Sequence, residues 1–171
     1  MSPCGKYRYR LERVLVDGPR RAGNRVNFIM LNPSTADATH NDPTIIRVQQ
    51  FARRFGFEEL VVTNLFALRA TNPAQLRTAE DPCGPDNESH LVLAALESRL
   101  VILAWGNSGA LGGAGQSVRL LLASLGMTDK LSRLGSVTKA GQPRHPLYLP
   151  STTEIEDWKG SLFNQRYSTH V

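Results

Sequence analysis

Four strand-like runs are spread along the chain, three of them apolar and the fourth weakly so, and each leads into polar residues. They cover residues 25–31 (RVNFIML), 60–64 (LVVTN), 100–105 (LVILAW) and 131–134 (LSRL). Runs without a polar face are typical of strands buried between two layers of helices. Because ligands of open α/β sheets bind outside the carboxyl ends of the strands, the polar residues that follow these runs predict one crevice at that edge.

Helical signals fill the intervals between the strands. Asp42 is a good N-cap and Pro43 suits the first helical position, while Gly56 favours the end of that helix. Further helices are predicted over residues 86–99, capped by Asp86, and over residues 116–125, with an edge strand within residues 7–16 and a long surface loop over residues 66–85.

The alternation of strands and helices predicts the α/β class with right-handed crossovers. We expect a three-layer α/β/α sandwich around a central, mainly parallel four-stranded sheet. A chain of 171 residues is one domain by length. We place this domain over residues 1–158 and a polar C-terminal tail over residues 159–171.

The composition is that of an ordinary soluble protein, with 41% hydrophobic and 20% charged residues. No apolar run approaches the roughly 20 residues of a membrane helix, and the N-terminal segment lacks the apolar core of a secretory signal. We therefore expect a cytoplasmic protein without membrane contact. Cys4 and Cys83 are too few and too far apart for a disulfide framework, a zinc site or an iron–sulfur cluster, so no metal or other cofactor is expected.

The formal net charge is +5, and the basic residues are clustered. They group at Lys6, Arg8, Arg10 and Arg13, at Arg20, Arg21 and Arg25, and at Arg53 and Arg54. Such clusters favour a polyanionic partner such as DNA or RNA. A mildly basic surface without that role is the alternative, and charge alone leaves both open.

Short motifs at the predicted strand ends resemble, in the same order, those of the uracil-DNA glycosylase superfamily. Residues 30–34 (MLNPS) stand where that superfamily has G-Q-D-P-Y or G-I-N-P-G, and residues 63–70 (TNLFALRA) match L-N-T-x-L-T-V-R-A. Residues 104–106 (AWG) match L-W-G, and residues 145–151 (HPLYLPS) correspond to H-P-S-P-L-S. The chain is more similar still to an uncharacterised bacterial and phage family with the signature L-N-P-S-T-A-D, a likeness that implies no activity.

The superfamily resemblance implies a monofunctional DNA glycosylase. Such an enzyme flips a nucleotide out of double-stranded DNA and hydrolyses the N-glycosidic bond, leaving an abasic site. The site positions a water near C1′ and stabilises the charge on the departing base. The implied partner is duplex DNA with a target base, the implied oligomeric state is a monomer, and no cofactor is needed.

The resemblance also gives roles to catalytic residues. Asn32 matches the water-positioning residue, and His145 matches the histidine that hydrogen-bonds the base carbonyl. Because an amide cannot accept a proton from water, a carboxylate nearby is expected, and Asp37 and Asp42 are the candidates. Asp42 has the alternative role of helix N-cap, which we favour, and Asp37 the alternative of a loop residue.

Asn64 matches the residue that reads the base edge, since an amide offers both a donor and an acceptor. Its alternative is a turn residue at a strand end. The other candidates for substrate binding are Pro33, Ser34, Phe66 and Trp105, and those for DNA binding are Arg69, Gly106, Asn107, Ser108, Arg144 and Tyr148. The glycine-rich segment 106–115 precedes a predicted helix, where backbone N–H groups favour phosphate, or it is a flexible connector.

One departure from the superfamily motifs bears on the substrate. Classical uracil enzymes have a Tyr that crowds C5 of the base at the position occupied here by Ser34. The smaller side chain suggests a C5-enlarged pyrimidine, such as a modified cytosine in phage DNA, rather than plain uracil. Antiviral defence or DNA repair would follow from such an activity.

Two other functions remain open at this stage. The scaffold could hydrolyse or transfer groups on free nucleotides, with the glycine-rich segment holding a phosphate. It could also be a non-catalytic DNA-binding module that senses a modified base.

Overall fold

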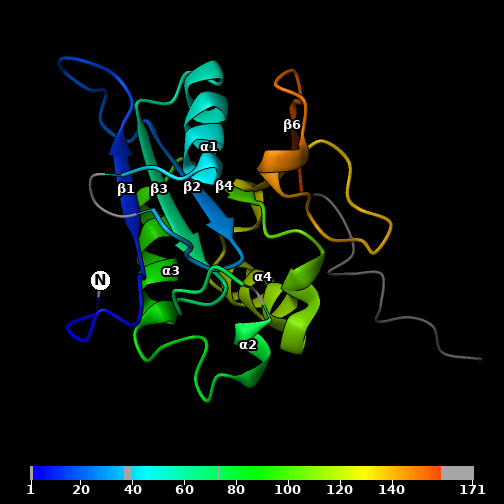
Figure 1. Ribbon diagram of the computed structural model, residues 1–171. Helices are drawn as coiled ribbons and strands as arrows, with labels where there is room; N and C mark the ends of the chain where they lie inside the picture. Colours follow the sequence, from blue (N-terminus) through cyan, green and yellow to red (C-terminus); the bar gives the residue numbers. More distant parts are fainter. Residues whose placement is uncertain (1, 37–39, 73, 159–171) are drawn as a thin grey trace, which may run out of the picture.

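The computed structural model describes residues 2–36, 40–72 and 74–158. Its centre is a six-stranded sheet in the order β1-β3-β2-β4-β5-β6 (Figure 1). The strands are β1 (Leu11–Val14), β2 (Arg25–Met30), β3 (Glu59–Asn64), β4 (Leu100–Leu103), β5 (Leu131–Leu134) and β6 (Ile155–Asp157). The prediction of an α/β fold is therefore confirmed.

The sheet has six strands, and the predicted number of four is wrong. The four predicted strands form its centre, where β2 pairs in parallel with β3 and β4, and β4 with β5. The short β1 and β6 extend the sheet at its two edges, where they pair antiparallel with β3 and β5. The edge strand predicted within residues 7–16 is present as β1, but it has only four residues.

The helices lie close to their predicted positions. They are α1 (Pro43–Arg54), α2 (Gln75–Thr78), α3 (Asn87–Glu97) and α4 (Ala114–Ser124), with 3₁₀ segments η1 (Asn107–Gly113), η2 (Thr128–Lys130) and η3 (Pro146–Tyr148). Asp42 caps α1 as expected, since its Oδ1 accepts a 2.8 Å hydrogen bond from the Ile45 N–H. Asp86 precedes α3, but its side chain makes no capping hydrogen bond, and α2 occupies part of the predicted loop.

Helices cover both faces of the sheet. Phe28 and Met30 of β2 belong to one buried cluster with Val48 of α1. Ile29, between them in the strand, belongs to a second cluster with Leu91 of α3 and Leu122 of α4. Successive strand residues point to opposite faces, so α1 forms one outer layer and α3 and α4 form the other. This burial on both sides explains why the central strands are apolar without interruption.

The strand order places a topological switch point between β2 and β4. From β2 the chain crosses through α1 to β3 on one side, and from β3 it returns through α3 to β4 on the other side (Figure 1). The register puts Asn64 level with Met30 and Leu103 level with Ile29, so β2, β3 and β4 end together. Crevices at such points are the usual ligand sites of open α/β sheets.

Across the described ranges, none of the helices has the length and apolar character needed to cross a membrane.

Candidate functional site

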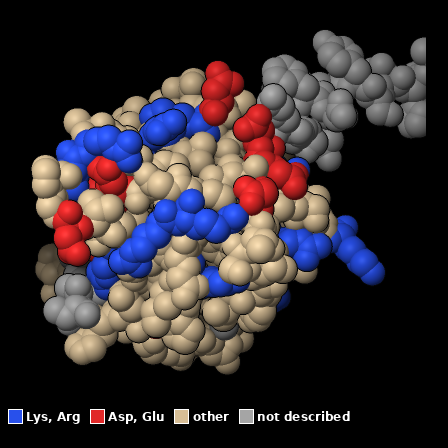
Figure 2. Space-filling view, turned by 90° about the horizontal axis from the view of Figure 1, so that it is seen from above, with Lys and Arg blue, Asp and Glu red and all other residues tan. Residues whose placement is uncertain are grey.

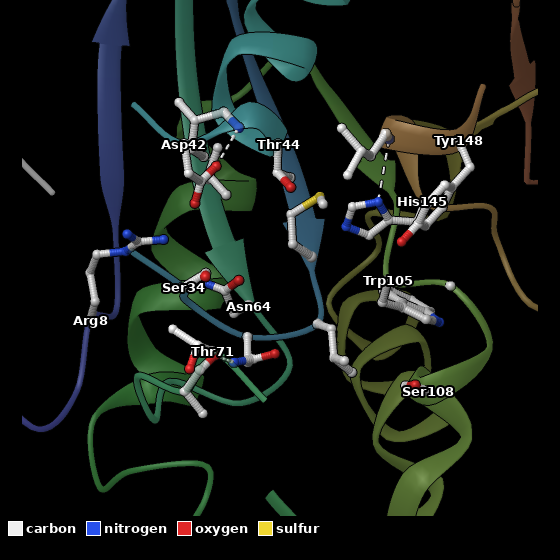
Figure 3. Close-up of a pocket in the computed structure, with 18 of the residues that line it drawn as sticks. Arg8, Ser34, Asp42, Thr44, Asn64, Thr71, Trp105, Ser108, His145 and Tyr148 are labelled. Atoms are coloured by element: carbon white, nitrogen blue, oxygen red, sulfur yellow. Dashed lines mark hydrogen bonds between the residues drawn. The ribbon is translucent and has the colours of Figure 1, made fainter. Parts of the chain in front are cut away.

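A cavity of about 340 Å³ opens at the carboxyl edge of the central strands, beside the switch point (Figure 3). Its walls come from the ends of β2, β3 and β4, the start of α1, η3 and the N-terminal arm before β1. Ten of the residues proposed from the sequence line it: Asn32, Ser34, Asp42, Asn64, Trp105, Gly106, Asn107, Ser108, His145 and Tyr148. The prediction of a single crevice at the strand ends therefore agrees with the position of this cavity.

Two residues proposed for substrate binding lie elsewhere. Pro33 is buried and absent from the cavity wall, and its carbonyl accepts a 3.0 Å hydrogen bond from the Ala70 N–H. Phe66 is 5% exposed and packs in the cluster that contains α3 and α4. The chain turns after β3, so the side chain of Phe66 faces away from the cavity that Asn64 lines.

Two arginines proposed for DNA binding are also outside the cavity wall. Arg69 and Arg144 are exposed, and the Arg144 Nε donates a 3.0 Å hydrogen bond to the Ser136 carbonyl. Asp37, one of the two proposed carboxylates, lies outside the described residues.

The amide of Asn32 is held in one orientation. Its Nδ2 donates to the Ala70 carbonyl at 2.7 Å and to the Pro33 carbonyl at 3.0 Å. Because both partners are acceptors, the nitrogen must face them, which leaves Oδ1 as the acceptor of this side chain. Asn32 can therefore orient a water or a ligand donor in the cavity.

Asn64 is 1% exposed and its side-chain nitrogen has no hydrogen-bond partner among the described residues. The backbone around it is fixed, because the Asn87 Nδ2 donates to the carbonyls of Asn64 and Leu65 at 3.0 and 3.1 Å. A buried donor without a partner costs about 1–3 kcal/mol. A ligand acceptor placed against Asn64 would remove that cost.

His145 is the N-cap of η3, and its Nδ1 accepts a 3.3 Å hydrogen bond from the Leu147 N–H, drawn as a dashed line in Figure 3. This contact assigns the proton of the neutral ring to Nε2. Burial lowers the pKa of His145, and the negative charge of Asp42 opposes that effect in part. The imidazole is thus neutral at pH 7, and Nε2–H is a donor for the cavity.

Asp42 has the predicted capping role and also lies in the cavity wall. Besides capping α1, its carboxylate lines the cavity, and its Oδ2 lies 3.4 Å from the Ala36 N–H. A carboxylate has about four lone-pair sites, so both contacts leave capacity for a ligand or a water. Within the described ranges, no three His, Cys, Asp or Glu side chains are grouped as metal ligands.

Trp105 is 1% exposed, lines the cavity and donates from Nε1 to the Gln142 Oε1 at 3.0 Å. The glycine-rich segment packs against this indole. A Cβ on Gly109 would lie 1.9 Å from the Trp105 Cδ1, and one on Gly115 would lie 2.9 Å from Cε2. These glycines are required by the close approach of the ring, a role that neither the phosphate nor the connector interpretation anticipated.

Only the first residues of the glycine-rich segment reach the cavity. Gly106, Asn107 and Ser108 line it, whereas Gly112 of η1 and Ala114 at the start of α4 line a different cavity of about 620 Å³. The start of α4 is therefore not part of this cavity wall, and the phosphate contact proposed for the glycine-rich segment stays a prediction.

Three polar residues of the cavity wall were missed by sequence reasoning: Arg8, Thr44 and Thr71. Arg8 is 4% exposed, and its Nη1 donates to the Ala36 carbonyl. The arm that carries it runs beside the chain beyond β3, where the Arg8 N–H donates to the Ala67 carbonyl at 2.9 Å. The sequence held one usable signal, because Arg8 lies between Tyr7 and Tyr9, in a segment predicted as an edge strand with a cluster of basic residues.

Comparison with known proteins identifies one family. Residues 8–147 match the model of DUF1643, described as a protein of unknown function, and this range covers most of the chain. Neither the curated proteins nor the solved structures contain a match.

Proposed function

We propose that this chain, which belongs to the DUF1643 family, is a DNA glycosylase that flips a base out of duplex DNA and hydrolyses its N-glycosidic bond. One observation carries the proposal. Asn32, Asn64 and His145 are far apart in sequence, yet they line the same cavity. These are the residues to which the resemblance gave the water, base-edge and leaving-group roles. On this proposal the layers around the parallel strands correspond to a uracil-DNA glycosylase-like sandwich.

The reaction adds water across the C1′–N bond. The Asn32 Oδ1 accepts a hydrogen bond from a water, which attacks C1′ as the glycosidic bond breaks and its electron pair moves to the base. The hydroxyl of the water stays on C1′, and its proton ends on the departing base. Asp42 lines the cavity and can carry this proton on the way. Its contacts with the Ile45 and Ala36 N–H groups leave lone pairs of the carboxylate free to accept it.

Two uncharged donors stabilise the departing base. The Nε2–H of neutral His145 donates to a base carbonyl, and the hydrogen bond strengthens as negative charge grows there. The unpartnered Nδ2 of Asn64 finds an acceptor on the base edge. The His145 ring is oriented by its contact with the Leu147 N–H before the substrate arrives, and Asn64 is held by its burial, an arrangement that favours the transition state.

The target base on this proposal is a pyrimidine enlarged at C5. Ser34 lines the cavity where the resemblance expects an excluding Tyr, so the wall beside the base is open. A modified cytosine in phage DNA fits this description, which would give the protein a role in antiviral defence. Uracil, which has no substituent at C5, is the alternative base and would imply a role in DNA repair.

One observation favours a second function, the hydrolysis of free nucleosides or nucleotides. The basic residues at the amino ends of β2 and β3 are paired with glutamates, as in the contacts of Arg21 with Glu58 and of Arg25 with Glu59. A small substrate would need no extended basic surface around the cavity. A base-sensing module without turnover is the remaining alternative.

A base-release assay tests the proposal. The protein is incubated with duplexes that carry uracil, 5-methylcytosine, 5-hydroxymethylcytosine or glucosylated 5-hydroxymethylcytosine, and free base is measured by mass spectrometry after alkali cleavage of abasic sites. Asn32→Ala, Asn64→Ala and His145→Ala should each slow release by about 10²–10³-fold. Gln50→Ala, an exposed amide on α1, is the matched control and should release base at the wild-type rate.

Folded wild-type protein that releases no base from any duplex would contradict the glycosylase function. The same assay on free nucleosides and nucleotides then decides between the two alternatives. Release from these small substrates supports the nucleotide enzyme, and tight base-dependent duplex binding without release supports the sensor.

A further inference from the structure

The cavity has two chemically different sides. One carries Arg8, Ser34, Asp42, Thr44 and Thr71, which we call the polar wall. In Figure 3 Arg8, Ser34, Asp42 and Thr71 lie across the cavity from His145 and Tyr148. The polar wall contains a guanidinium, a carboxylate and three hydroxyl groups.

The polar wall is built into the fold. Arg8 is 4% exposed, and its Nη1 donates to the Ala36 carbonyl, while the Ala36 N–H lies 3.4 Å from the Asp42 Oδ2. One loop residue thus ties the cation and the carboxylate to the same segment. Such fixed groups select ligands by their hydrogen-bond pattern, because little reorganisation is needed on binding.

The mixture of groups discriminates between ligand chemistries. A phosphate would accept from Arg8 but would be repelled by the carboxylate of Asp42. A methyl group would cover these polar atoms without replacing the water that solvates them. A hydroxyl both donates and accepts, so it can donate to Asp42 and accept from Arg8.

We propose that the polar wall recognises a hydroxyl-bearing substituent of the target base, either a hydroxymethyl group or a sugar attached through it. Arg8 and Asp42 are the specificity-determining residues, and Thr71 adds a hydroxyl contact. This inference rests on the proposed function, because it takes the base to lie between Asn64 and His145. The substituent then points toward Ser34, whose small side chain leaves the polar wall accessible.

Binding is measured first, with His145→Ala protein so that release does not interfere. Matched duplexes carry 5-methylcytosine, 5-hydroxymethylcytosine, glucosylated 5-hydroxymethylcytosine or the anionic 5-carboxylcytosine. One of the two hydroxyl-bearing duplexes should bind about 10- to 100-fold more tightly than the methylated one, the range expected for hydrogen bonds to charged groups. The carboxyl-bearing duplex should bind less tightly than that duplex.

Arg8→Met, added to the same background, should reduce the preference for the hydroxyl-bearing over the methylated duplex to about one. Arg8→Lys keeps the charge and should restore part of it. Thr71→Val is nearly isosteric and removes neither of the hydrogen bonds of Ala36 with Arg8 and Asp42. It should lower the preference by a smaller factor, and it keeps the test valid if the Arg8 variants do not fold.

Equal binding of the methylated and hydroxyl-bearing duplexes by the protein with Arg8 intact would overturn the inference. If the Arg8 and Thr71 variants lose the same factor of affinity for both duplexes, the inference is also overturned. Arg8 would then only position the segment that contains Ala36. Tightest binding of the carboxyl-bearing duplex would assign the wall to anions instead. These binding measurements need no base release. If the release assay fails but the hydroxyl-bearing duplex still binds more tightly, the glycosylase activity is excluded and the recognition of the hydroxyl group stands.

Discussion

The two edges of the central sheet differ in the chemistry they carry. At the carboxyl edge, amides, an imidazole and an indole surround a cavity, together with one buried guanidinium, of Arg8, and one carboxylate, of Asp42. At the amino edge, basic and acidic side chains alternate over the surface, as Figure 2 shows from above. The pairs Arg21–Glu58, Arg25–Glu59 and Arg25–Glu97 measure 2.6, 2.9 and 2.8 Å, and Arg20 also contacts Glu59.

This difference limits what net charge reveals. The formal charge of +5 suggested a polyanion, but several arginines behind that suggestion are paired with glutamates at the edge away from the cavity. Exposed pairs of this kind each contribute about 0–1 kcal/mol. The carboxyl edge, where polar groups line a cavity in the fold, should therefore be sensitive to substitution, and the amino edge should tolerate it.

The largest effect is expected from Gly109→Ala. The new Cβ would lie 1.9 Å from the Trp105 Cδ1, so the indole must move away from Gln142. Overpacking of this kind costs about 1–3 kcal/mol, which lowers Tm by several degrees for a chain of this size. Thermal unfolding measures it, with Ala110→Ser at the exposed neighbour as control. An unchanged Tm would contradict the prediction, because it would show that the residues around Trp105 can move at little cost in free energy.

A smaller effect is expected from Glu59→Gln, which removes the carboxylate that Arg20 and Arg25 share. Stability should fall by less than about 1 kcal/mol, and affinity for a duplex should stay within about twofold. Urea unfolding and a duplex titration at fixed salt measure the two quantities. Glu58→Gln, which releases Arg21, should behave alike. If either variant binds duplex tenfold more tightly, DNA contacts the amino edge. The proposed difference between the two edges would then be wrong.

The smallest effect concerns pH. Burial holds the pKa of His145 below its ordinary value of about 6.5, so on acidification the unfolded chain binds a proton before the folded protein does. The contribution of His145 to stability is complete above pH 6.5 and is lost as the pH falls through the lowered pKa.

Between pH 7 and pH 5, the Tm of the wild-type protein should therefore fall more than that of His145→Gln. The pKa of His90 is also lowered, mainly by burial, but His90 is present in both proteins and its effect cancels. His90→Gln serves as the matched control and should retain the His145 effect. Equal losses in wild type and His145→Gln would place the titrating group elsewhere.

Sequence reasoning succeeded where an element is long enough to carry its own pattern. The six residues of β2 and of β3, and the capped twelve-residue α1, are of this kind. It also found the four-residue β4 and β5, which lie in the strand-like runs. It missed the three-residue β6 and the four-residue α2, because these have no apolar pattern of their own and depend on contacts from distant parts of the chain.

The candidate site follows the same rule. Asn32, Asn64 and Trp105 follow or end buried strands, so the topology alone brings them together. The position of Arg8 could not be predicted in this way. Arg8 does not follow a central strand, and its burial results from the arm that packs beside the chain beyond β3. Phe66 was placed by motif likeness, and the turn after β3 directs it into the core instead.

The indole of Trp105 also gives the cavity an internal optical reporter. The chain has two tryptophans, and the other, Trp158, is 9% exposed and packs against the guanidinium groups of Arg119 and Arg133. In a Trp158→Phe variant the remaining emission would come from the wall of the cavity. An aromatic ligand entering beside Trp105 would change its intensity and wavelength, so occupancy could be followed in real time without a label.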